Sequence, residues 1–378
     1  MDGVDVAVAD LLLNGDGIDL RPIGHTELPY PSELRTALLD ALPPNATTAQ
    51  QVCQLDTAVG QAFAATAEHA LATIAGGRAD LVASLGQTVY HWVDGDRALG
   101  TLQLGQPAWI AEATGLPVVS DLRARDVAAG GHGAPLALVL DRLWLAGRPG
   151  TTAALNIGGI ANITVVTPDG PALAFDTGPG NALLDAAARM ISGGVWHQDT
   201  DGDLAAQGKV DADLLDALLA DPYYKLDPPK STGKEHFHRE HIAAALAEVG
   251  HVAGDDLLAT LVELTAVTVA DACRLLGVTR VVASGGGVRN PTLMAALRRR
   301  LAPASVETSD DLGLPSSAKE AYLTALLGFL TWSGVPGTTR LLGSVTPGAE
   351  PLRLPAPATA EVARLRVVDH EGGSRASA

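Results

Sequence analysis

One carboxylate lies between two glycine-rich turns in the middle of the chain, a pattern typical of phosphate chemistry. Gly158-Gly159 follows an apolar run, and Asp176 stands directly before Thr177-Gly178-Pro179-Gly180-Asn181. Backbone N–H groups at a helix N-terminus attract anions, and glycine lets a phosphate approach closely. The alternative is a tight turn with an asparagine cap. We expect a functional site here, with Gly178, Gly180 and Asn181 facing a phosphate.

Three short strands should position this stretch. Ala153–Ile157, Ile160–Val166 and Pro171–Phe175 are apolar runs of strand length, and Gly158-Gly159 predicts a two-residue hairpin between the first two. The third strand should end at Phe175 and place Asp176 at its tip, before a helix that begins near Ala182.

A second glycine loop follows a later strand, predicted over Arg280–Ala283. Ser284-Gly285-Gly286-Gly287 leads from it towards a helix over Thr292–Leu301. A dinucleotide fingerprint would need glycine at Asn290, so a Rossmann interpretation is weak. The alternatives are a compact strand-to-helix turn, or a loop in which Gly285, Gly286 and Gly287 pass close to an adenosine.

The start of the chain repeats part of the central pattern. Val4–Leu11 and Ile18–Leu28 are predicted strands that resemble the middle and end of the meander at 153–176. A repeated topology would place one more strand and a loop before Asp2. We therefore expect a clipped N-terminus, through a misplaced start codon or a real loss.

Charged residues near predicted element ends supply further candidates. Arg125 belongs to a charged segment, 121–126, that precedes a glycine loop; the segment is either a site or hinge, or a surface salt-bridge cluster. Glu320 lies among apolar residues of a helix predicted over Ser316–Leu330, as a capped surface group or an acceptor for sugar hydroxyls. Gly233-Lys234, in a loop over Pro222–Phe237, imitates the end of a P-loop, but Glu235 replaces the required Ser or Thr.

Composition excludes several classes of protein. The 378 residues are 47% hydrophobic with a net charge of −17, which fits about two domains and disfavours nucleic acid and anionic membranes as partners. Cys53 and Cys273 are too few for a disulfide framework. No signal peptide or membrane-spanning run is evident, so a soluble, cytoplasmic protein is expected. Strands that alternate with helices indicate an α/β fold.

Several motifs together resemble the anhydro-N-acetylmuramic acid kinase family of the sugar kinase/Hsp70/actin superfamily. They are LPVVSDLRARDVAAGG, GAPL, NIGGIANIT, FDTGPGN, PPKSTGKEHF, DLLATLVELTA and GGGVRNP. The resemblance implies a two-domain, actin-like ATPase fold of the ribonuclease H-like type, with a cleft between the domains. It implies domain I over 1–125 plus 339–370, domain II over 126–338, and a loose tail over 371–378.

The resemblance also implies a reaction and its residues. ATP, 1,6-anhydro-N-acetylmuramic acid and water would give N-acetylmuramic acid 6-phosphate and ADP, in peptidoglycan recycling, with Mg²⁺ as cofactor and no metal-ligating residue assigned. Asp176 matches the family's base, and Arg125 and Glu320 would hold the sugar. Asp2 and Gly3 remain from a phosphate-gripping G-T-S-x-D-G motif. The resemblance also implies that the protein is a homodimer.

The sequence departs from the family pattern at single positions. Leu85 stands for a histidine, Gln106 for an aspartate and His132 for a glutamine. Two alternatives therefore stay open: a kinase for another anhydro or amino sugar, and a degenerate kinase fold that binds sugar or nucleotide without turnover.

Overall fold

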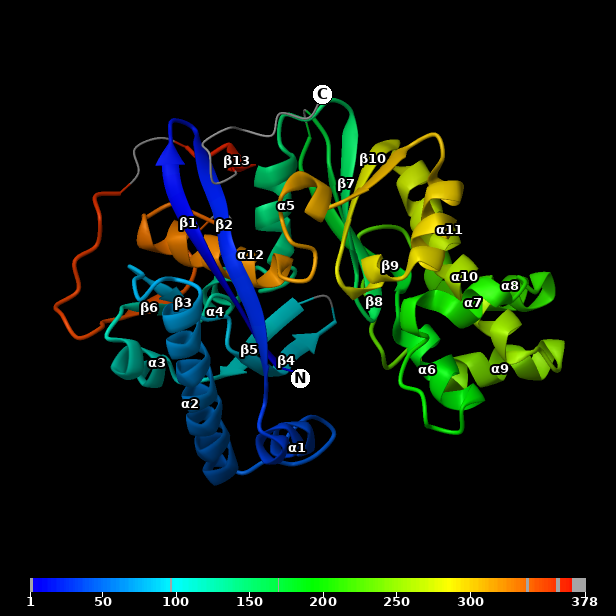
Figure 1. The fold of residues 1–378 in the computed structure, drawn as a ribbon, viewed down its shortest axis with the longest axis horizontal. Helices are drawn as coiled ribbons and strands as arrows, with labels where there is room; N and C mark the ends of the chain where they lie inside the picture. The colour runs from blue at the N-terminus through cyan, green and yellow to red at the C-terminus, as the bar shows by residue number, and fades with distance from the viewer. Residues whose placement is uncertain (1–2, 96, 169, 338–339, 358–360, 369–378) are drawn as a thin grey trace. The chain divides into compact units, whose positions relative to one another are not determined.

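Two compact units make up the computed structural model (Figure 1), which describes residues 3–95, 97–168, 170–337, 340–357 and 361–368. Unit 1 contains Met1–Trp144 and Ala318–Ala378, and unit 2 contains Leu145–Ser317. None of the helices in these ranges is long and apolar enough to cross a bilayer. The domain boundaries near residues 125 and 339 stay a prediction, and the tail over 371–378 lies outside the described residues.

Unit 2 is built on a five-stranded sheet in the order β11-β10-β7-β8-β9. Its strands are β7 (Thr151–Ile157), β8 (Ile160–Val166), β9 (Leu173–Pro179), β10 (Val278–Ser284) and β11 (Ser305–Thr308). β8 runs antiparallel to β7 and β9, while β10 runs parallel to β7 and β11. In the ribonuclease H-like arrangement, three antiparallel strands form a meander, and two further strands lie beside its first strand and run parallel to it. This sheet has that arrangement. The predicted α/β fold class is confirmed.

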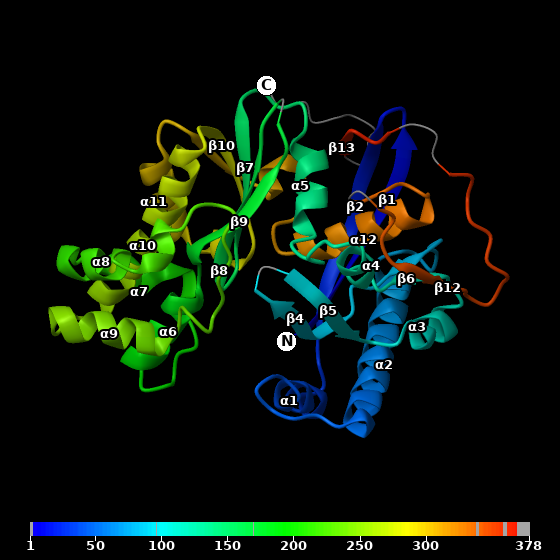
Figure 2. The same ribbon diagram turned by 180° about the vertical axis from the view of Figure 1, so that it is seen from behind.

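Helices pack around this sheet, with α10 (Gly254–Leu275) at their centre (Figures 1 and 2). α10 is buried on most faces and contacts α6, α7, α8 and α11. Each fully buried leucine on it contributes about 1.5–3 kcal/mol. The other helices of unit 2 are α6 (Ala182–Ile191), α7 (Asp203–Gln207), α8 (Ala212–Leu219), α9 (Arg239–Val249) and α11 (Pro291–Leu301).

The strands of unit 1 form a sheet in two pieces, β1-β2-β13 and β12-β6-β3, beside a separate hairpin, β4-β5. Their bounds are β1 (Gly3–Asn14), β2 (Gly17–Pro29), β3 (Val82–Ala83), β4 (Gln87–Asp94), β5 (Arg97–Leu104), β6 (Val118–Ser120), β12 (Ser344–Thr346) and β13 (Arg364–Val367). β1 and β2 correspond to β8 and β9, and the parallel pair β3 and β6 corresponds to β10 and β11. Within the described ranges, unit 1 has no counterpart of β7, so β1 and β3 each keep one unpaired edge.

The helices of unit 1 begin where local capping chemistry allows. α2 (Ala49–Thr73) starts with a capping box, in which the Thr48 side chain accepts from Gln51 N–H and Gln51 in turn accepts from Thr48 N–H. α3 (Pro107–Thr114) has proline at its first position and ends at Gly115 with φ 70°. The remaining helices are α1 (Ser32–Asp40), α4 (Ala124–Ala128), α5 (Ala137–Leu145) and α12 (Lys319–Trp332).

A buried ion pair lies beside both points where the chain passes from one unit to the other. Lys319 Nζ is 2.6 Å from Asp141 Oδ1, and both side chains are less than a tenth exposed. The same ammonium lies 5.8 Å from the centre of the Trp144 ring. Asp141 and Trp144 precede the first crossing and Lys319 follows the second, so one charge pair joins the two crossing segments.

A buried carboxylate also fixes α11 against α10. Glu263 is only 3% exposed and pairs with Arg299 and Arg300 in the last turn of α11. Cations in the last turn of a helix also suit its dipole. Glu263 is the specific partner of both arginines. A buried carboxylate needs charged donors, and the two guanidinium groups supply them.

We expect the double variant Arg299→Ala/Arg300→Ala to lose about 1–3 kcal/mol of stability, because Glu263 would remain buried without a partner. Either single substitution should cost less, since one arginine still pairs with Glu263. Urea unfolding monitored by circular dichroism would measure this, with Arg298→Ala in the same turn as the control. A double variant as stable as the control would contradict the assignment.

Candidate functional site

Asp176 lies inside β9 and not at its tip. The prediction that the third strand ends at Phe175 is wrong, because β9 continues to Pro179, which pairs with Ile160 of β8. The register shifts between Ala161 and Asn162, so that Gly178 faces Ala161 while Asp176 faces Asn162. The extra residue, Thr177, is buried and its hydroxyl donates to Ala161 O at 3.1 Å. Such bulges redirect neighbouring side chains, and Asp176 is the residue directly before Thr177.

The short helix η2 (Pro222–Lys225) and the loop after it hold Asp176 through four hydrogen bonds. Asp176 N–H donates to Lys230 O at 3.0 Å. Asp176 Oδ2 accepts from Ser231 Oγ at 3.0 Å and from Thr232 N–H at 2.9 Å. Tyr223 Oη donates to Asp176 O at 2.7 Å. Among the described residues nothing donates to Oδ1, so one carboxylate oxygen is oriented by the protein and the other is free to take a proton.

The surroundings raise the pKa of the Asp176 carboxyl above its usual range. Burial is the main cause, because it penalises the charged form, and the negative charge of Glu235 adds to it. The donated hydrogen bonds from Thr232 and Ser231 act in the opposite direction without cancelling burial. A carboxylate with a raised pKa is a stronger base than one in water, which suits proton abstraction.

The N–H groups at the start of α6 are already bonded within the protein. Gly180 N–H and Ala182 N–H donate to Gly159 O at 2.9 Å, and Asn181 N–H donates to Gly158 O at 2.8 Å. A Cβ on Gly180 would lie 2.4 Å from Gly158 O, so glycine is needed for this close contact. These three groups therefore join two turns and are not open donors for an anion.

The Gly158-Gly159 turn differs in detail from the expected two-residue hairpin. Ile157 pairs with Ala161, which leaves three residues in the loop, and neither glycine has a positive φ. The primed turns typical of two-residue hairpins require a positive φ. The carbonyl groups of Gly158 and Gly159 instead accept hydrogen bonds from the N–H groups at the start of α6.

Lys234 brings a positive charge to this turn, which the incomplete P-loop motif indicated only weakly. A Cβ on Gly159 would lie 2.3 Å from Lys234 Cε and 3.2 Å from Nζ, so the lysine side chain lies against the Gly159 backbone. The charge also acts on Asp185 of α6, whose pKa burial raises while Arg189 and Lys234 lower it. The P-loop motif fails here, but an exposed ammonium still lies on the glycine turn.

The second glycine loop, predicted from the sequence at Gly285–Gly287, follows β10 at the same edge of the sheet. Gly285 has φ 86° and its N–H donates to Ser316 O at 3.2 Å. Cβ atoms on Gly285 and Gly287 would collide with Ile157 of β7, whereas a Cβ on Gly286 would meet only Arg289, at 3.7 Å. Gly286 is therefore the residue of this loop whose backbone is open to a ligand.

The carboxyl ends of β7, β9 and β10 bring these features to one sheet edge. β7 and β10 are parallel, with Asn156 opposite Ser284, and β9 runs in the same direction beyond β8. Ligands of open α/β sheets bind outside the carboxyl ends of strands. The structure thus gathers the Gly158-Gly159 turn, Asp176 and the Gly285–Gly287 loop within unit 2.

Two further predicted site residues, Arg125 and Glu320, belong to unit 1 and are exposed. Arg125 lies on α4, and Glu320 lies in the first turn of α12. The basic group that the charge of Glu320 affects is Arg123, which the sequence analysis did not select. Arg123 Nη1 donates to Gly133 O at 2.7 Å, and burial lowers its pKa while Glu320 raises it. Its partial burial could not be read from the local sequence.

Two further predictions concern the start of the chain. Gly3 is the first residue of β1, opposite Pro29, and a Cβ there would lie 2.6 Å from Glu27 Oε1. Asp2 lies outside the described residues. Asp5, on the same strand, has a pKa raised by burial and by the charges of Glu27 and Glu320.

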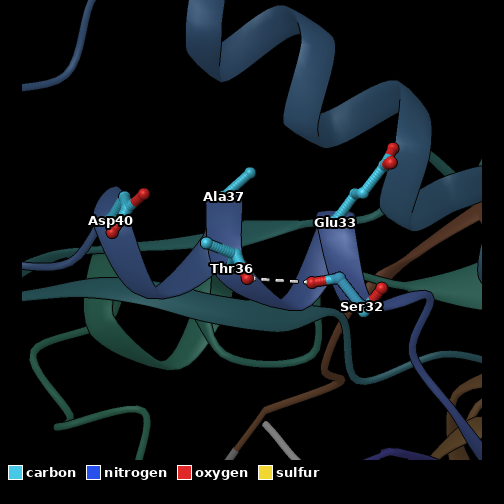
Figure 3. Close-up of a pocket in the computed structure, with 5 residues that line it drawn as sticks. All are labelled: Ser32, Glu33, Thr36, Ala37 and Asp40. Atoms are coloured by element: carbon cyan, nitrogen blue, oxygen red, sulfur yellow. Dashed lines mark hydrogen bonds between the residues drawn. The ribbon is translucent and has the colours of Figure 1, made fainter.

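A hollow along α1 does not involve any predicted site residue (Figure 3). One helix lines it alone, through Ser32, Glu33, Thr36, Ala37 and Asp40, and Thr36 Oγ1 donates to Ser32 O at 3.0 Å. A surface formed by one helix offers no convergent polar groups, so it is not a candidate site.

The raised pKa of Asp176 predicts a pH-dependent cost to stability. In the folded state the carboxyl binds its proton more tightly than in the unfolded chain, so stability should fall as pH rises from about 3.9 through the folded pKa. Asp176→Asn removes this titration. The stability of the wild type relative to the variant should therefore decrease over that window in urea unfolding. A difference that does not vary with pH would show that the carboxyl is not perturbed.

Comparison with known proteins found matches over most of the chain. A family model described as "Anhydro-N-acetylmuramic acid kinase" matches residues 1–356. A relative of that name from Streptomyces coelicolor is 57% identical over 376 residues, covering 97% of this chain and 96% of its own. One from Rhodococcus erythropolis is 52% identical, covering 93% and 92%.

One solved structure shows a distant similarity. A ROK family glucokinase from Streptomyces griseus, solved with glucose and AMPPNP, is 14% identical with a TM-score of 0.35, covering 85% of this chain and 98% of its own. That score is too low to bear on the argument. The family model and the relatives cover most of the chain at high identity, and the chain therefore belongs to the anhydro-N-acetylmuramic acid kinase family.

Proposed function

We propose that this chain uses ATP and water to convert 1,6-anhydro-N-acetylmuramic acid into N-acetylmuramic acid 6-phosphate and ADP. The observation that carries the proposal is the Asp176 carboxylate, with Oδ2 held by Ser231 and Thr232 and Oδ1 left open. A base needs one fixed orientation and one oxygen free for the proton. The family name of the relatives supplies the substrate.

The reaction balances through a single proton abstraction. Water attacks the anomeric carbon while Asp176 takes its proton, the bond from that carbon to the bridging oxygen breaks, and the released oxygen takes the terminal phosphoryl group of ATP. A positioned base of this kind contributes about 10²–10⁴-fold to the rate. The burial that raises the pKa of Asp176 strengthens it as a base near neutral pH.

The nucleotide would lie along the carboxyl edge of the unit 2 sheet. Gly286 has open space at its α-carbon and fits close passage of an adenosine, while Gly285 and Gly287 shape the loop against Ile157. The positive charge of Lys234 would face the negative charge of the phosphates. Gly178, Gly180 and Asn181 would contribute by the shape of their turn, since the N–H groups of Gly180 and Asn181 are bonded to the Gly158-Gly159 turn. Asp2 and Gly3 are proposed as further phosphate contacts from unit 1.

Magnesium is proposed as a partner of the phosphates. Mg²⁺ is held by one or two carboxylates together with phosphate oxygens and water, and no carboxylate of this chain is assigned to it, because Asp176 Oδ1 is the oxygen left to take the proton. The ion would neutralise charge on the transferring phosphoryl group.

The sugar would be held from unit 1. Arg125 and Glu320 are proposed for this role, and Arg123 joins them because the charge of Glu320 acts on it. An arginine and a carboxylate together can donate to and accept from the hydroxyl and amide groups of an amino sugar.

We also propose that the protein works as a homodimer in the cytoplasm, in peptidoglycan recycling, as the family resemblance implies. The predicted domains I and II are proposed as its two functional halves.

Asp176→Asn should reduce turnover by about 10²–10⁴-fold while the fold stays intact. Mass spectrometry of the sugar after incubation with Mg-ATP would follow a product heavier by one phosphoryl group and one water. Asp213→Asn, at an exposed position of α8 in the same unit, is the matched control and should keep full activity. Normal turnover in Asp176→Asn would refute the role. Wild-type protein that binds ATP or sugar without forming product would favour a binding-only function.

Lys234→Ala should raise the KM for ATP, because one charge opposite the phosphates is lost. Lys209→Ala removes an exposed lysine elsewhere in the same unit and should leave the KM unchanged. Steady-state kinetics with varied Mg-ATP at saturating sugar would measure both. An equal effect of the two substitutions would assign the change to net charge and not to the glycine turn.

A further inference from the structure

A cluster of one carboxylate and two imidazoles lies beside the loop that holds Asp176. Asp221 precedes η2, His236 lies near the end of the loop, and His241 lies in the first turn of α9. One ligand atom from each lies within 4.8 Å of the other two. Three separate segments of the chain therefore direct metal-ligand atoms to one point.

The distances within this cluster fit a tetrahedral ion. Asp221 Oδ2 is 2.8 Å from His236 Nε2 and 3.7 Å from His241 Nδ1. Ligands about 2.0–2.2 Å from a tetrahedral zinc ion are separated by about 3.3 Å, which falls between these two values. Asp221 Oδ2 thus faces two imidazole nitrogens at unequal distances. An ion bound between the three atoms would make these two distances nearly equal.

Neighbouring groups orient each of the three side chains. Asp221 Oδ1 accepts from Tyr223 N–H at 2.8 Å, which leaves Oδ2 to face the histidines. The rings of His236 and His241 pack edge-on against Phe237, with centroids 4.5 and 5.3 Å away. His236 is 40% exposed, so an ion and a water ligand can reach the site from solvent. Such preorganisation of ligands strengthens metal binding.

The donor set selects the kind of ion. Two imidazole nitrogens and one carboxylate oxygen suit zinc and related transition metals, whereas Mg²⁺ and Ca²⁺ prefer oxygen ligands alone. We propose that Asp221, His236 and His241 form a binding site for one divalent transition-metal ion of the zinc type, separate from the Mg²⁺ that accompanies ATP.

Occupancy of this site would stiffen the loop around Asp176. Asp221 adjoins η2, whose Tyr223 hydroxyl bonds to Asp176 O. His236 ends the segment that supplies Ser231 and Thr232 to the carboxylate. An ion held by both would fix the two segments to each other and to α9, and would slow the opening of the loop. Metal binding itself does not depend on the proposed function.

Cobalt titration of the full-length, tag-free protein tests the site directly. The protein carries Cys53→Ser to remove an exposed thiol, and is first depleted of metal with a chelator. We expect one Co²⁺ per chain, with the intense visible absorption of a tetrahedral site and displacement by Zn²⁺. His236→Ala and Asp221→Asn should each weaken binding by at least about 10–100-fold, the range found even for loss of outer partners of metal ligands.

The neighbouring His238 supplies a matched control. It pairs with Glu240 outside the cluster and is exposed, so His238→Ala should bind Co²⁺ as the parent does. Hydrogen exchange of residues 230–237 should slow on Zn²⁺ addition in the parent and in His238→Ala, but not in His236→Ala. No stoichiometric binding, or equal weakening by His238→Ala and His236→Ala, would overturn the proposal. His236 is on the surface, so its variant tests the site even if Asp221→Asn fails to fold.

Discussion

The bond between Thr232 N–H and Asp176 Oδ2 is the interaction on which the candidate site depends. Asp176 stands next to the bulge at Thr177, and its N–H donates to Lys230 O in the same loop as Thr232. The same loop that satisfies the carboxylate also buries it, and burial keeps the proton affinity of the carboxyl high. Orientation and basicity thus have one structural origin.

Fold and site could be predicted to different depths. The strands β7 and β8, the start of α6 at Ala182 and the buried helix α10 follow from apolar periodicity and turn residues, and the structure has them within a few residues. The end of β9 could not be predicted, because pairing of Pro179 with Ile160 overrides the local preference of Gly178 and Pro179 for a turn. Motif resemblance selected Asp176, whereas the four residues that hydrogen-bond to it lie about fifty residues away in the chain and leave no local signal.

Glycine in this chain serves contact between backbones more than contact with ligands. Gly180 lies against Gly158, and Gly285 and Gly287 lie against Ile157, so three loops at one sheet edge are fitted to each other. The glycine pattern alone could not show that the N–H groups of Gly180, Asn181 and Ala182 are bonded within the protein. Lys234 and Gly286 are the elements that remain accessible, and neither could be chosen without knowing what their neighbours contact.

Unit 2 is one continuous segment, whereas unit 1 is interrupted by it, and this has a consequence for synthesis on the ribosome. Domains fold as units while the chain emerges from its N-terminus. Leu145–Ser317 contains every strand of its sheet and can close once it has emerged. β2 and β6 must wait for β13 and β12, and Asp141 must wait for Lys319. The first half of unit 1 therefore spends translation with open strand edges, so nascent-chain chaperones should engage residues 1–144 for longer than the segment that follows.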